Sequence, residues 1–397
     1  MKSDRSNLSR PRVGIVCGPL HPVYGGPASV VWSHYQALKD YADVIIFGVV
    51  TDEERKDVEE LYPGVRLARR SLPNAWFRGD SLYSLLISHA NDIDVFHVHM
   101  LWDHPVFVTW RACRYLRKPF VLTPHGTLSE PWRYSSPHKR LYKYLIGDRI
   151  IRSAFTVQAL NEKEASAIHY ACSNVHVSVI PNGIDLRELR SVEKIEKVGR
   201  FEGSFPQINI SGKRLFLYLG RLWRDKGLDI LPSAWKLAFA GRNDALLLIV
   251  GPDYNNYKAE LVREISDLDL TASVKILPSV RGHDKILLLN LASAFILPSK
   301  SEGFSMALLE AAGSGIPCIF SCECNFPELA WNGGGLEIAR NVKDLAQALL
   351  RLMEMSSNEL HEIGSKAKEF VMERYSLENV RENLLDCYNS AINQVHK

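Results

Sequence analysis

Short apolar runs alternate with longer stretches of helical composition along the first half of the chain. The runs are rich in Val, Ile, Leu and Phe, as expected of strands that a parallel sheet buries on both faces. We expect strands at residues 13–17, 44–50, 95–98, 120–123, 155–159 and 177–180, with helical stretches such as 28–39, 81–90 and 162–170 between them. This order of elements predicts one doubly wound α/β domain.

A break at Pro181, Asn182 and Gly183 ends this first series. A charged stretch with little apolar periodicity follows, and we interpret residues 186–213 as a linker. A second alternating series predicts strands at residues 215–219, 246–250, 274–277, 295–297 and 318–320. The tail from residue 341 onwards is helical in composition. The expected organisation is an N-terminal domain over 1–185, a second doubly wound domain over 214–375 and a C-terminal helix over 376–397.

The composition is that of a chain with sizeable folded cores. Of the 397 residues, 46% are hydrophobic and 23% are charged, which fits two ordinary domains. The formal net charge is +3, and there is no long block of Lys and Arg. We therefore expect no nucleic acid among the partners.

The N-terminal sequence and the cysteines indicate an intracellular setting. Residues 1–12 are polar and lack the apolar core of a signal peptide, and no segment offers about 18 uninterrupted apolar residues. We therefore expect a cytoplasmic location. Seven cysteines, an odd number without framework spacing, indicate reduced thiols. The nearest group, Cys318, Cys322 and Cys324, has no matching second half, so we expect no zinc site there.

Glycines follow several predicted strands of the second domain, at Gly220, Gly251 and Gly303. Open α/β sheets place their ligands at this end of the strands, so two such domains would present a cleft between them. Arg221 and Lys226 come directly after the first of these glycines. Their charges could converge on one dianionic group, and a diphosphate is the natural candidate. The alternative is a solvated loop with ordinary cations.

Glu302 and Glu310 flank the predicted start of a helix, with Gly303, Phe304 and Ser305 at its entrance. Free amides at a helix N-terminus favour anions. The two oxygens of Glu310 suit a pair of vicinal hydroxyls such as those of a ribose, although an exposed helix carboxylate is the simpler alternative. Glu302 would be repelled by bound phosphates unless the cations after the first strand of this domain offset its charge. Its expected role is to hold sugar hydroxyls and to favour positive charge at an anomeric carbon.

Six motifs, in the order in which they occur, resemble family 4 of the retaining glycosyltransferases, the large group 1 set. They are Gly25-Gly26-Pro27, His97-Val98-His99, Pro124-His125-Gly126-Thr127-Leu128, residues 179–185, Gly220-Arg221 with Lys226-Gly227, and the Glu302/Glu310 pair. Each motif is weak alone, but the resemblance covers nearly the whole chain. The fold that it implies is α/β of the GT-B type, with two doubly wound Rossmann-like domains facing each other across a cleft.

The resemblance implies a donor-binding role for residues of the second domain. Arg221 and Lys226 would bind the donor diphosphate, together with backbone amides of Gly303, Phe304 and Ser305.

Further roles follow from the same resemblance. Glu310 would hold the nucleotide ribose, and Glu302 would contact the donor sugar. Gly26 would let its loop approach the phosphates, and His125 would reach the sugar from the N-terminal domain. Glu302 and His125 are the expected catalytic residues. Residues 278–281 would lie near the base, and the C-terminal helix would cross back onto the first domain.

The family transfers a sugar from a nucleotide donor with retention at the anomeric carbon, generally without an obligatory metal. The resemblance therefore implies no metal site and no cofactor apart from the nucleotide-sugar substrate. Asp92 and Asp94 match the letters of a metal-binding Asp-x-Asp, but they precede a predicted strand, where we expect a turn. The sequence offers no nucleophile, and the resemblance then implies the front-face route proposed for the family, in which the leaving phosphate helps to take the acceptor proton.

Histidines are frequent in the first domain, at His97, His99, His104 and His125. His97 and His99 would share one face of a strand without a neighbouring carboxylate in the right role for a metal site. We therefore expect them to support substrate-contacting residues or to line the acceptor pocket. His125 lies at a strand end, a position suited to a side chain that faces a cleft, with a purely structural role as the alternative.

Residues 132–152 combine basic and aromatic side chains. The basic ones are Arg133, Lys139, Arg140, Lys143, Arg149 and Arg152, against the single acid Asp148. This composition fits peripheral contact with an anionic membrane, which a polyprenyl-linked acceptor would explain. The alternative is an amphipathic helix that packs its apolar side on the first domain.

The stretches 123–128 and 325–329 are most similar to family members that assemble bacterial exopolysaccharide or lipopolysaccharide. The expected function is transfer of a hexosyl group from a nucleotide-diphosphate sugar to a glycan or lipid-linked saccharide. A non-catalytic homologue stays open, as does another nucleotide-sugar enzyme such as an epimerase or phosphorylase. Residues 321–328 replace a Gly-Gly turn that many members have, which leaves the contacts of Glu328 open.

Overall fold

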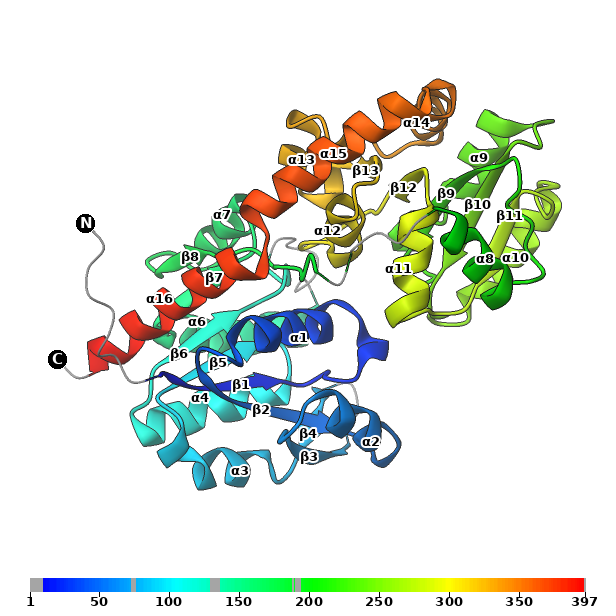
Figure 1. Ribbon diagram of the computed structural model, residues 1–397. Coiled ribbons are helices and arrows are strands. Elements are labelled where there is room, and N and C mark those ends of the chain that lie inside the picture. The colour runs from blue at the N-terminus through cyan, green and yellow to red at the C-terminus, as the bar shows by residue number, and fades with distance from the viewer. Residues whose placement is uncertain (1–9, 73–75, 129–135, 188, 190–193, 396–397) are drawn as a thin grey trace, which may run out of the picture. The chain divides into compact units, whose positions relative to one another are not determined.

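The computed structural model describes residues 10–72, 76–128, 136–187, 189 and 194–395. The chain divides into two compact units. One consists of Met1–Gly183 together with Leu377–Lys397, and the other of Ile184–Ser376. Each unit is built on its own β-sheet (Figure 1).

The first unit contains an eight-stranded sheet in the order β4-β3-β2-β1-β5-β6-β7-β8. The strands are β1 (Arg12–Cys17), β2 (Asp43–Val50), β3 (Arg66–Ser71), β4 (Arg78–Gly79), β5 (Val95–His99), β6 (Phe120–Thr123), β7 (Thr156–Ala159) and β8 (Val177–Val179). Neighbouring strands are parallel, except for the pair β3 and β4. The strand order reverses between β1 and β5, so the carboxyl ends of these two strands form the topological switch point of the unit.

Helices cover both faces of the first sheet. They are α1 (Gly26–Leu38), α2 (Asp52–Leu61), α3 (Leu82–Ser88), α4 (His104–Leu116), α5 (Pro137–Tyr142), α6 (Asp148–Ser153), α7 (Glu162–Ala171) and α16 (Leu377–Val395). Thr51 and Glu54 form a capping box at the start of α2. The C-terminal helix α16, red in Figure 1, packs against α1 and places Leu384 and Tyr388 in the core on that face of the sheet.

The second unit contains a six-stranded sheet in the order β11-β10-β9-β12-β13-β14, with every neighbouring pair parallel. Its strands are β9 (Arg214–Leu219), β10 (Ala245–Val250), β11 (Val274–Leu277), β12 (Ala294–Leu297), β13 (Cys318–Ser321) and β14 (Gly335–Ile338). Its helices are α8 (Lys194–Ser204), α9 (Leu231–Phe239), α10 (Tyr257–Asp267), α11 (Gly282–Leu291), α12 (Met306–Gly313), α13 (Pro327–Trp331), α14 (Val342–Glu354) and α15 (Ser357–Arg374). The switch point of this sheet lies between β9 and β12.

The predicted fold class, α/β with two doubly wound sheets, is confirmed. The apolar pattern missed β3, β4 and β14. The sequence of β3 is rich in arginine, and β14 is only partly buried, so neither shows the continuous apolar run of a strand covered on both faces. Part of the stretch with little periodicity forms α8, whose Phe201 lies in the second core together with Phe205, the residue that follows the helix.

Within the described residues, no helix combines the length and the apolar character needed to span a bilayer. All seven cysteines are free thiols, and six of them are buried. Cys318 and Cys324 each donate to a backbone carbonyl inside the second core, whereas Cys322 is exposed. The three cysteines therefore do not point to one common ligand.

Candidate functional site

The loops after β9 and β12 are bonded to each other at the switch point of the second unit. The amide of Lys300 donates to the carbonyl oxygen of Asp225 at 2.7 Å, and the hydroxyl of Ser299 donates to the same oxygen at 3.1 Å. One loop carries Arg221 and Lys226, and the other carries Glu302. These hydrogen bonds fix the two loops to each other and bring the expected site residues of both into one place.

Gly227 makes the close approach of these loops possible. Its φ of 89° lies in the left-handed region, and a Cβ there would lie 2.3 Å from the carbonyl oxygen of Pro298 at the end of β12. Gly227 also ends the short 3-10 helix Arg224–Lys226. Any other residue would be strained and would push the loop that carries Lys226 away from β12.

Lys226 and Glu302 form an ion pair with 2.6 Å between Nζ and Oε1. Both side chains are largely buried, with exposed fractions of 20% and 10%. The backbone of Glu302 is held as well, because its carbonyl oxygen accepts a hydrogen bond from the Asn325 amide at 2.6 Å. A buried carboxylate is stable only with such a partner, so the cation expected to offset Glu302 is in place.

Arg221 lies on the same loop and is held by an aromatic ring. Its guanidinium lies 4.8 Å from the ring centroid of Tyr254, and its carbonyl oxygen accepts from the hydroxyl of Tyr218 at 3.0 Å. Among the described residues, no carboxylate lies within ion-pair distance of this guanidinium. A stacked guanidinium without an acidic partner is well suited to an anionic ligand.

The helix α12 starts at Met306, four residues after Glu302. The Ser305 hydroxyl accepts a hydrogen bond from the amide of Leu308 at 3.3 Å and so caps the helix. Phe304 packs against the rings of Phe326 and Tyr375, with centroids 5.2 and 5.6 Å away. These contacts hold Gly303, Phe304 and Ser305 at the positive end of the helix dipole.

Glu310 has a partner that sequence reasoning missed. Lys285 on α11 pairs with it, with 2.8 Å between Nζ and Oε1. Exposed fractions of 32% for Lys285 and 19% for Glu310 show a pair that solvent still reaches. Nothing in the linear pattern around Lys285 signals this contact, because it depends on how α11 and α12 pack. The second oxygen of Glu310, which no described residue bonds, and the partly exposed ammonium of Lys285 together can bind hydroxyl groups.

In the first unit, His125 lies in a tight turn after β6. Its φ is 56° and that of Gly126 is 71°, so two consecutive residues adopt the left-handed conformation. A buried carboxylate, Glu164 on α7, holds this turn by accepting from the amides of Gly126 at 2.6 Å and Leu160 at 2.8 Å. Burial raises the pKa of Glu164, and these two hydrogen bonds oppose the rise. Sequence reasoning missed Glu164, since a carboxylate early in a helix usually faces solvent.

Four histidines form a stack behind this turn. Ring centroids are 5.1 Å apart for His99 and His125, 4.4 Å for His97 and His99, and 5.3 Å for His34 and His97. His34, His97 and His99 are fully buried. Burial lowers the pKa of His34 to about 3 and of His125 to about 4, and it holds the pKa values of the other two well below the usual range. All four rings are therefore neutral at neutral pH.

The stack also contains the one group of described residues with the geometry to hold a metal ion, His34, His97 and His99. Both nitrogens of His97 are engaged, however, with the hydroxyls of Tyr388 and Thr123 at 2.7 Å each. A metal ion would have to displace one of these bonds. The structure therefore does not offer three free ligands here.

Asp103 is a second buried group at the switch point of the first unit that sequence reasoning missed. One carboxylate oxygen accepts from the amide of Val106 and caps α4, while Oδ2 has no partner among the described residues. A Cβ at Gly18, after β1, would lie 2.7 Å from this oxygen, so only a glycine fits there. Burial raises the pKa of Asp103 to about 7.

Gly26 is the first residue of α1, after Gly25 with its φ of 75°. It is exposed, and a Cβ there would meet no atom within 4 Å. The protein itself therefore gives no steric reason for a glycine at this position. A ligand that approaches the backbone would supply one.

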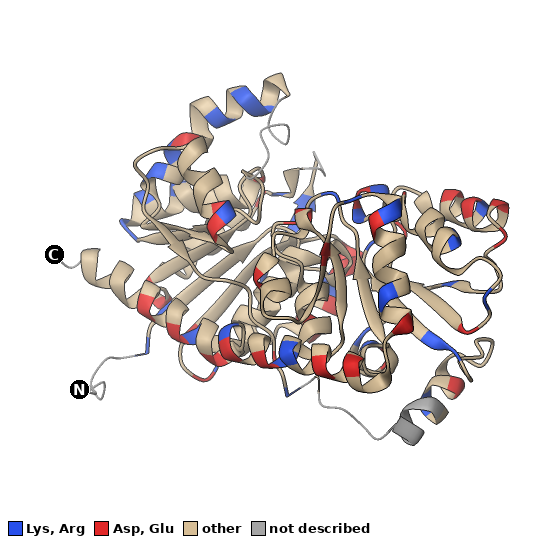
Figure 2. Cartoon of the chain, turned by 90° about the horizontal axis from the view of Figure 1, so that it is seen from above, with Lys and Arg blue, Asp and Glu red and all other residues tan. Residues whose placement is uncertain are grey.

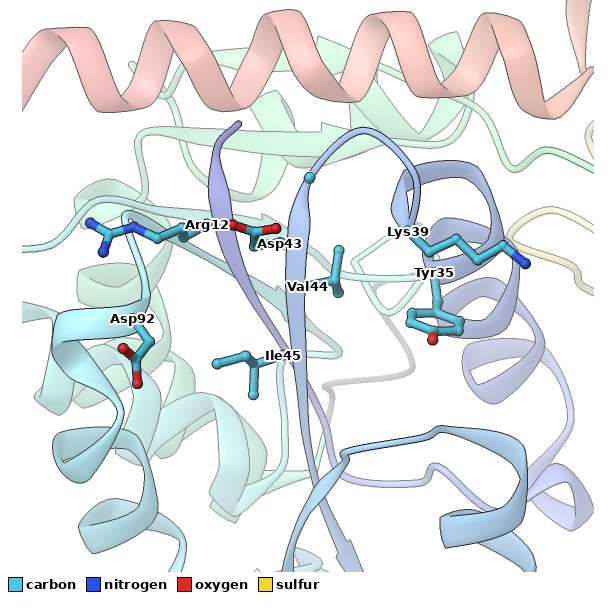
Figure 3. Close-up of a pocket in the computed structure, with 8 residues that line it drawn as sticks. Arg12, Tyr35, Lys39, Asp43, Val44, Ile45 and Asp92 are labelled. Atoms are coloured by element: carbon cyan, nitrogen blue, oxygen red, sulfur yellow. The ribbon is translucent and has the colours of Figure 1, made fainter. Parts of the chain in front are cut away.

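The Asp-x-Asp pair is placed away from the switch point of the first unit, before the amino end of β5. Asp92 closes a 3-10 turn before β5, and Asp94 binds the backbone amide and guanidinium of Arg12. A cavity of about 430 Å³ lies beside Asp92, lined by this residue and by Arg12, Lys39 and Asp43 among others (Figure 3). It lies at the amino ends of β1 and β2, whereas ligands of such sheets bind at the carboxyl ends. It is therefore separate from the switch point of the first unit.

Two family models match the chain. The model of Glycosyltransferase Family 4 matches residues 24–188, and that of Glycosyl transferases group 1 matches residues 201–370. The first therefore lies in the first unit and runs a few residues past its boundary, and the second lies in the unit that carries Arg221, Lys226, Glu302 and Glu310.

Characterised relatives match over most of the chain. A GDP-mannose:cellobiosyl-diphosphopolyprenol alpha-mannosyltransferase of Xanthomonas campestris is 24% identical, over 94% of this chain and 95% of its own length. A UDP-Gal:alpha-D-GlcNAc-diphosphoundecaprenol alpha-1,3-galactosyltransferase of Escherichia coli is 28% identical over 61% of this chain and 60% of its own length.

Solved structures share the fold. HepE of Anabaena, in complex with UDP and glucose, superposes with a TM-score of 0.79 at 18% identity, over 95% of this chain and 99% of HepE. The order of the two sheets, the motifs at their switch points and the two family models agree, and the chain belongs to family 4 of the group 1 glycosyltransferases, with the GT-B fold.

Proposed function

We propose that the protein is a retaining glycosyltransferase that moves a hexosyl group from a nucleotide-diphosphate sugar to a glycan or lipid-linked saccharide. The reaction belongs to the synthesis of bacterial exopolysaccharide or lipopolysaccharide. The observation that carries the proposal is the pairing of Lys226 with Glu302 and of Lys285 with Glu310 around the start of α12. Both pairs put charged groups where parallel α/β sheets bind their ligands.

The donor diphosphate is proposed to bind Arg221 and Lys226 and the amides at the start of α12. Arg221 has no acidic partner among the described residues, so an incoming phosphate does not compete with a carboxylate for it. Lys226 is shared with Glu302, which keeps the carboxylate beside the phosphates without net repulsion. Glu310 and Lys285 are proposed to hold the ribose hydroxyls.

Glu302 is proposed to act on the donor sugar electrostatically. As the bond to the leaving phosphate stretches, positive charge grows at the anomeric carbon, and a fixed carboxylate next to it lowers the barrier. Its ion pair with Lys226 makes it a poor nucleophile, which fits a front-face route with retention. No step of this route requires a metal ion.

The two named relatives support the choice of donor and acceptor class. One uses GDP-mannose and the other UDP-Gal, and both names place the acceptor sugar on a polyprenol diphosphate. For this chain we propose a nucleotide sugar as donor and a polyprenyl-linked saccharide as one acceptor class.

A donor panel tests the enzyme proposal. Purified protein is expected to bind at least one nucleoside diphosphate and to hydrolyse slowly, in the absence of acceptor, at least one UDP- or GDP-linked hexose. Isothermal titration calorimetry and release of the nucleoside diphosphate are the measurements, each repeated with a chelator to test the need for metal. Protein that binds none of the diphosphates and hydrolyses none of the donors would contradict the proposal and favour a non-catalytic homologue.

The membrane contact is also a proposal, and it rests on α5, α6 and the π-helical turn Lys143–Gly147 between them. Leu141, Tyr144 and Leu145 are exposed there, Tyr144 by 76%, next to the exposed cations Arg140 and Arg149. Elsewhere, Lys and Arg are interspersed with Asp and Glu along most helices (Figure 2). Trp132 and Arg133 of the predicted segment lie outside the described residues.

Lys143 does not belong to this surface. Its ammonium donates to Asp148 at 2.7 Å and to the carbonyl oxygen of Ala171 at 2.8 Å, and its side chain is 16% exposed. It therefore holds α5 to the first unit instead of facing a membrane.

Flotation with vesicles of anionic lipid tests this surface. Replacing Arg140 and Arg149 by glutamine is expected to weaken binding roughly thirtyfold, since each cation near an anionic surface contributes about 1 kcal/mol. Leu141→Ser with Tyr144→Ser is expected to abolish flotation at low salt. The control, Leu237→Ser with Lys366→Gln, alters exposed residues of the second unit and should float as wild type does. Unchanged flotation of the first two variants would remove the membrane from the proposal.

A further inference from the structure

His99 and His125 share a single hydrogen bond across the stack. His99 Nδ1 and His125 Nε2 are 2.9 Å apart, with the ring planes 23° from parallel. Only one proton fits between these nitrogens, and it can belong to either ring. For neutral rings, this choice decides whether Nδ1, the second nitrogen of His125, carries a proton.

The second nitrogen of His99 distinguishes the two arrangements. Its Nε2 is buried and has no hydrogen-bond partner among the described residues. If His125 donated the shared proton, neutral His99 would carry its own proton on Nε2, as a buried N–H without an acceptor. Such orphaned donors are rarer in proteins than unsatisfied acceptors. The structure therefore favours the proton on His99 Nδ1, with a bare Nε2.

The surroundings keep both rings neutral. His97 stacks on His99 and His34 packs against it at a tilt of 52°, and all three are fully buried. His97 is tied to Tyr388 and Thr123, both uncharged. No carboxylate among the described residues bonds any ring of the stack, so nothing there stabilises an imidazolium.

The position of His125 leaves its Nδ1 proton available to a ligand. His125 is only partly buried, and no described residue bonds its Nδ1. Its backbone is fixed in the left-handed region by the Glu164 bond to Gly126. A proton on His125 Nδ1 is therefore presented by a rigid turn and can be satisfied by water or by a substrate.

We propose that His99 is a positioning residue, which donates its Nδ1 proton to His125 Nε2 and so makes His125 Nδ1–H a hydrogen-bond donor to an oxygen of the donor sugar. The assignment of the accepting oxygen to the donor sugar rests on the proposed function, whereas the position of the proton between His99 and His125 does not. Neutral His125 then cannot act as a general base through Nδ1, because that nitrogen already carries the proton.

Nitrogen NMR of the full-length protein with ¹⁵N-labelled histidine tests the proton position. The signals of His125 are identified by their loss in His125→Asn. In wild type, His125 is expected to show a protonated Nδ1 and a bare Nε2, and His99 the same. A protonated Nε2 on His125 would overturn the inference. So would a zinc ion that copurifies with the protein and whose removal shifts the His99 signals.

Variants of His99 test the positioning role. His99→Asn keeps an amide N–H where Nδ1 lies, so His125 is expected to stay protonated on Nδ1. His99→Leu removes the donor, and the His125 proton is expected to become divided between the two nitrogens. Turnover should fall roughly tenfold in H99L, the scale of one neutral hydrogen bond, and be largely rescued in H99N. Binding of the nucleoside diphosphate alone should not change in either variant.

The two kinds of failure can be told apart. Absence of any transferase activity with an intact Nδ1 proton contradicts the proposed function and leaves the proton assignment standing. Equal turnover in H99L and wild type, with the His125 proton moved, contradicts the positioning role alone.

Discussion

Replacing Glu302 or Lys226 by alanine is expected to lower turnover roughly a hundredfold or more, the scale of losing one preorganised electrostatic contact. Glu302→Ala removes the carboxylate that is proposed to stabilise the positive charge developing at the anomeric carbon. Loss of Lys226 removes a phosphate ligand and also leaves Glu302 buried without its cation, 2.6 Å away in the wild type. Initial rates with a donor identified from the panel are the measurement.

The double variant separates these contributions. Because the two side chains act as a pair, Glu302→Ala should cost much less in a Lys226→Ala background than in wild type. Diphosphate affinity should fall in K226A and change little in E302A. Glu362→Ala is the matched control, since it breaks the exposed pair of Glu362 with Lys366 on α15 and should leave turnover unchanged. Wild-type rates in both single variants would refute the assigned roles.

Acid is expected to destabilise the first unit before the second. The pKa of His34 falls from an ordinary 6.5 to about 3 on folding, because burial disfavours its charged form. A group whose pKa is lower in the folded state contributes stability that is present above its pKa in the unfolded state. This stability is lost as the pH falls toward its pKa in the folded state. For His34 the loss accumulates between about pH 6.5 and pH 3 and reaches several kcal/mol, at about 1.4 kcal/mol per unit.

Other buried groups modify this response. His97 and His99 add to it with the same sign, since burial also lowers their pKa values. Asp103 and Glu164 have raised pKa values and act in the opposite direction, because the folded state takes up their protons first. The histidines outnumber these two carboxyl groups, so the net effect of acid on this unit is destabilising.

A variant isolates the histidine contribution. His34→Leu removes two buried nitrogens that have no partner among the described residues, so it should cost little stability at pH 7.5 and should flatten the acid response. Urea unfolding between pH 4.5 and 7.5, followed by hydrogen exchange of peptides from each unit, is the measurement. His176→Leu, at an exposed position, is the control. A first unit as acid-stable as the second in wild type would contradict the expectation.

The chain's apolar pattern predicted the sheets better than it predicted the site. Both faces of strands such as β1 and β10 are covered, so β10 is apolar throughout and β1 is apolar after Arg12, and that pattern is visible in the sequence. The family and the fold class are confirmed. The pairing of Lys226 with Glu302 matches the expected charge balance, but the roles of both residues stay predictions.

What the sequence could not show depends on packing between elements far apart in the chain. Lys285 meets Glu310 only because α11 and α12 lie next to each other in the folded unit. Glu164 becomes a buried hydrogen-bond acceptor only because the fold brings to it the amide of Gly126, in the His125 turn, and the amide of Leu160, after β7. The fully buried His34 resembles any helix histidine in the sequence, and only the fold shows that its nitrogens lack partners.

The position of α16 has a consequence for the order in which the chain folds during synthesis. The bond between Tyr388 and His97 joins residues 291 positions apart, whereas the second unit is one continuous segment, Ile184–Ser376. A ribosome delivers α16 last, so the second unit has all its residues before the first unit has its final helix. We expect the usual order of N-terminal domain first to be reversed. Until then the face of β5 that receives Tyr388 stays open, and a stalled or truncated chain would expose apolar surface on the first unit alone.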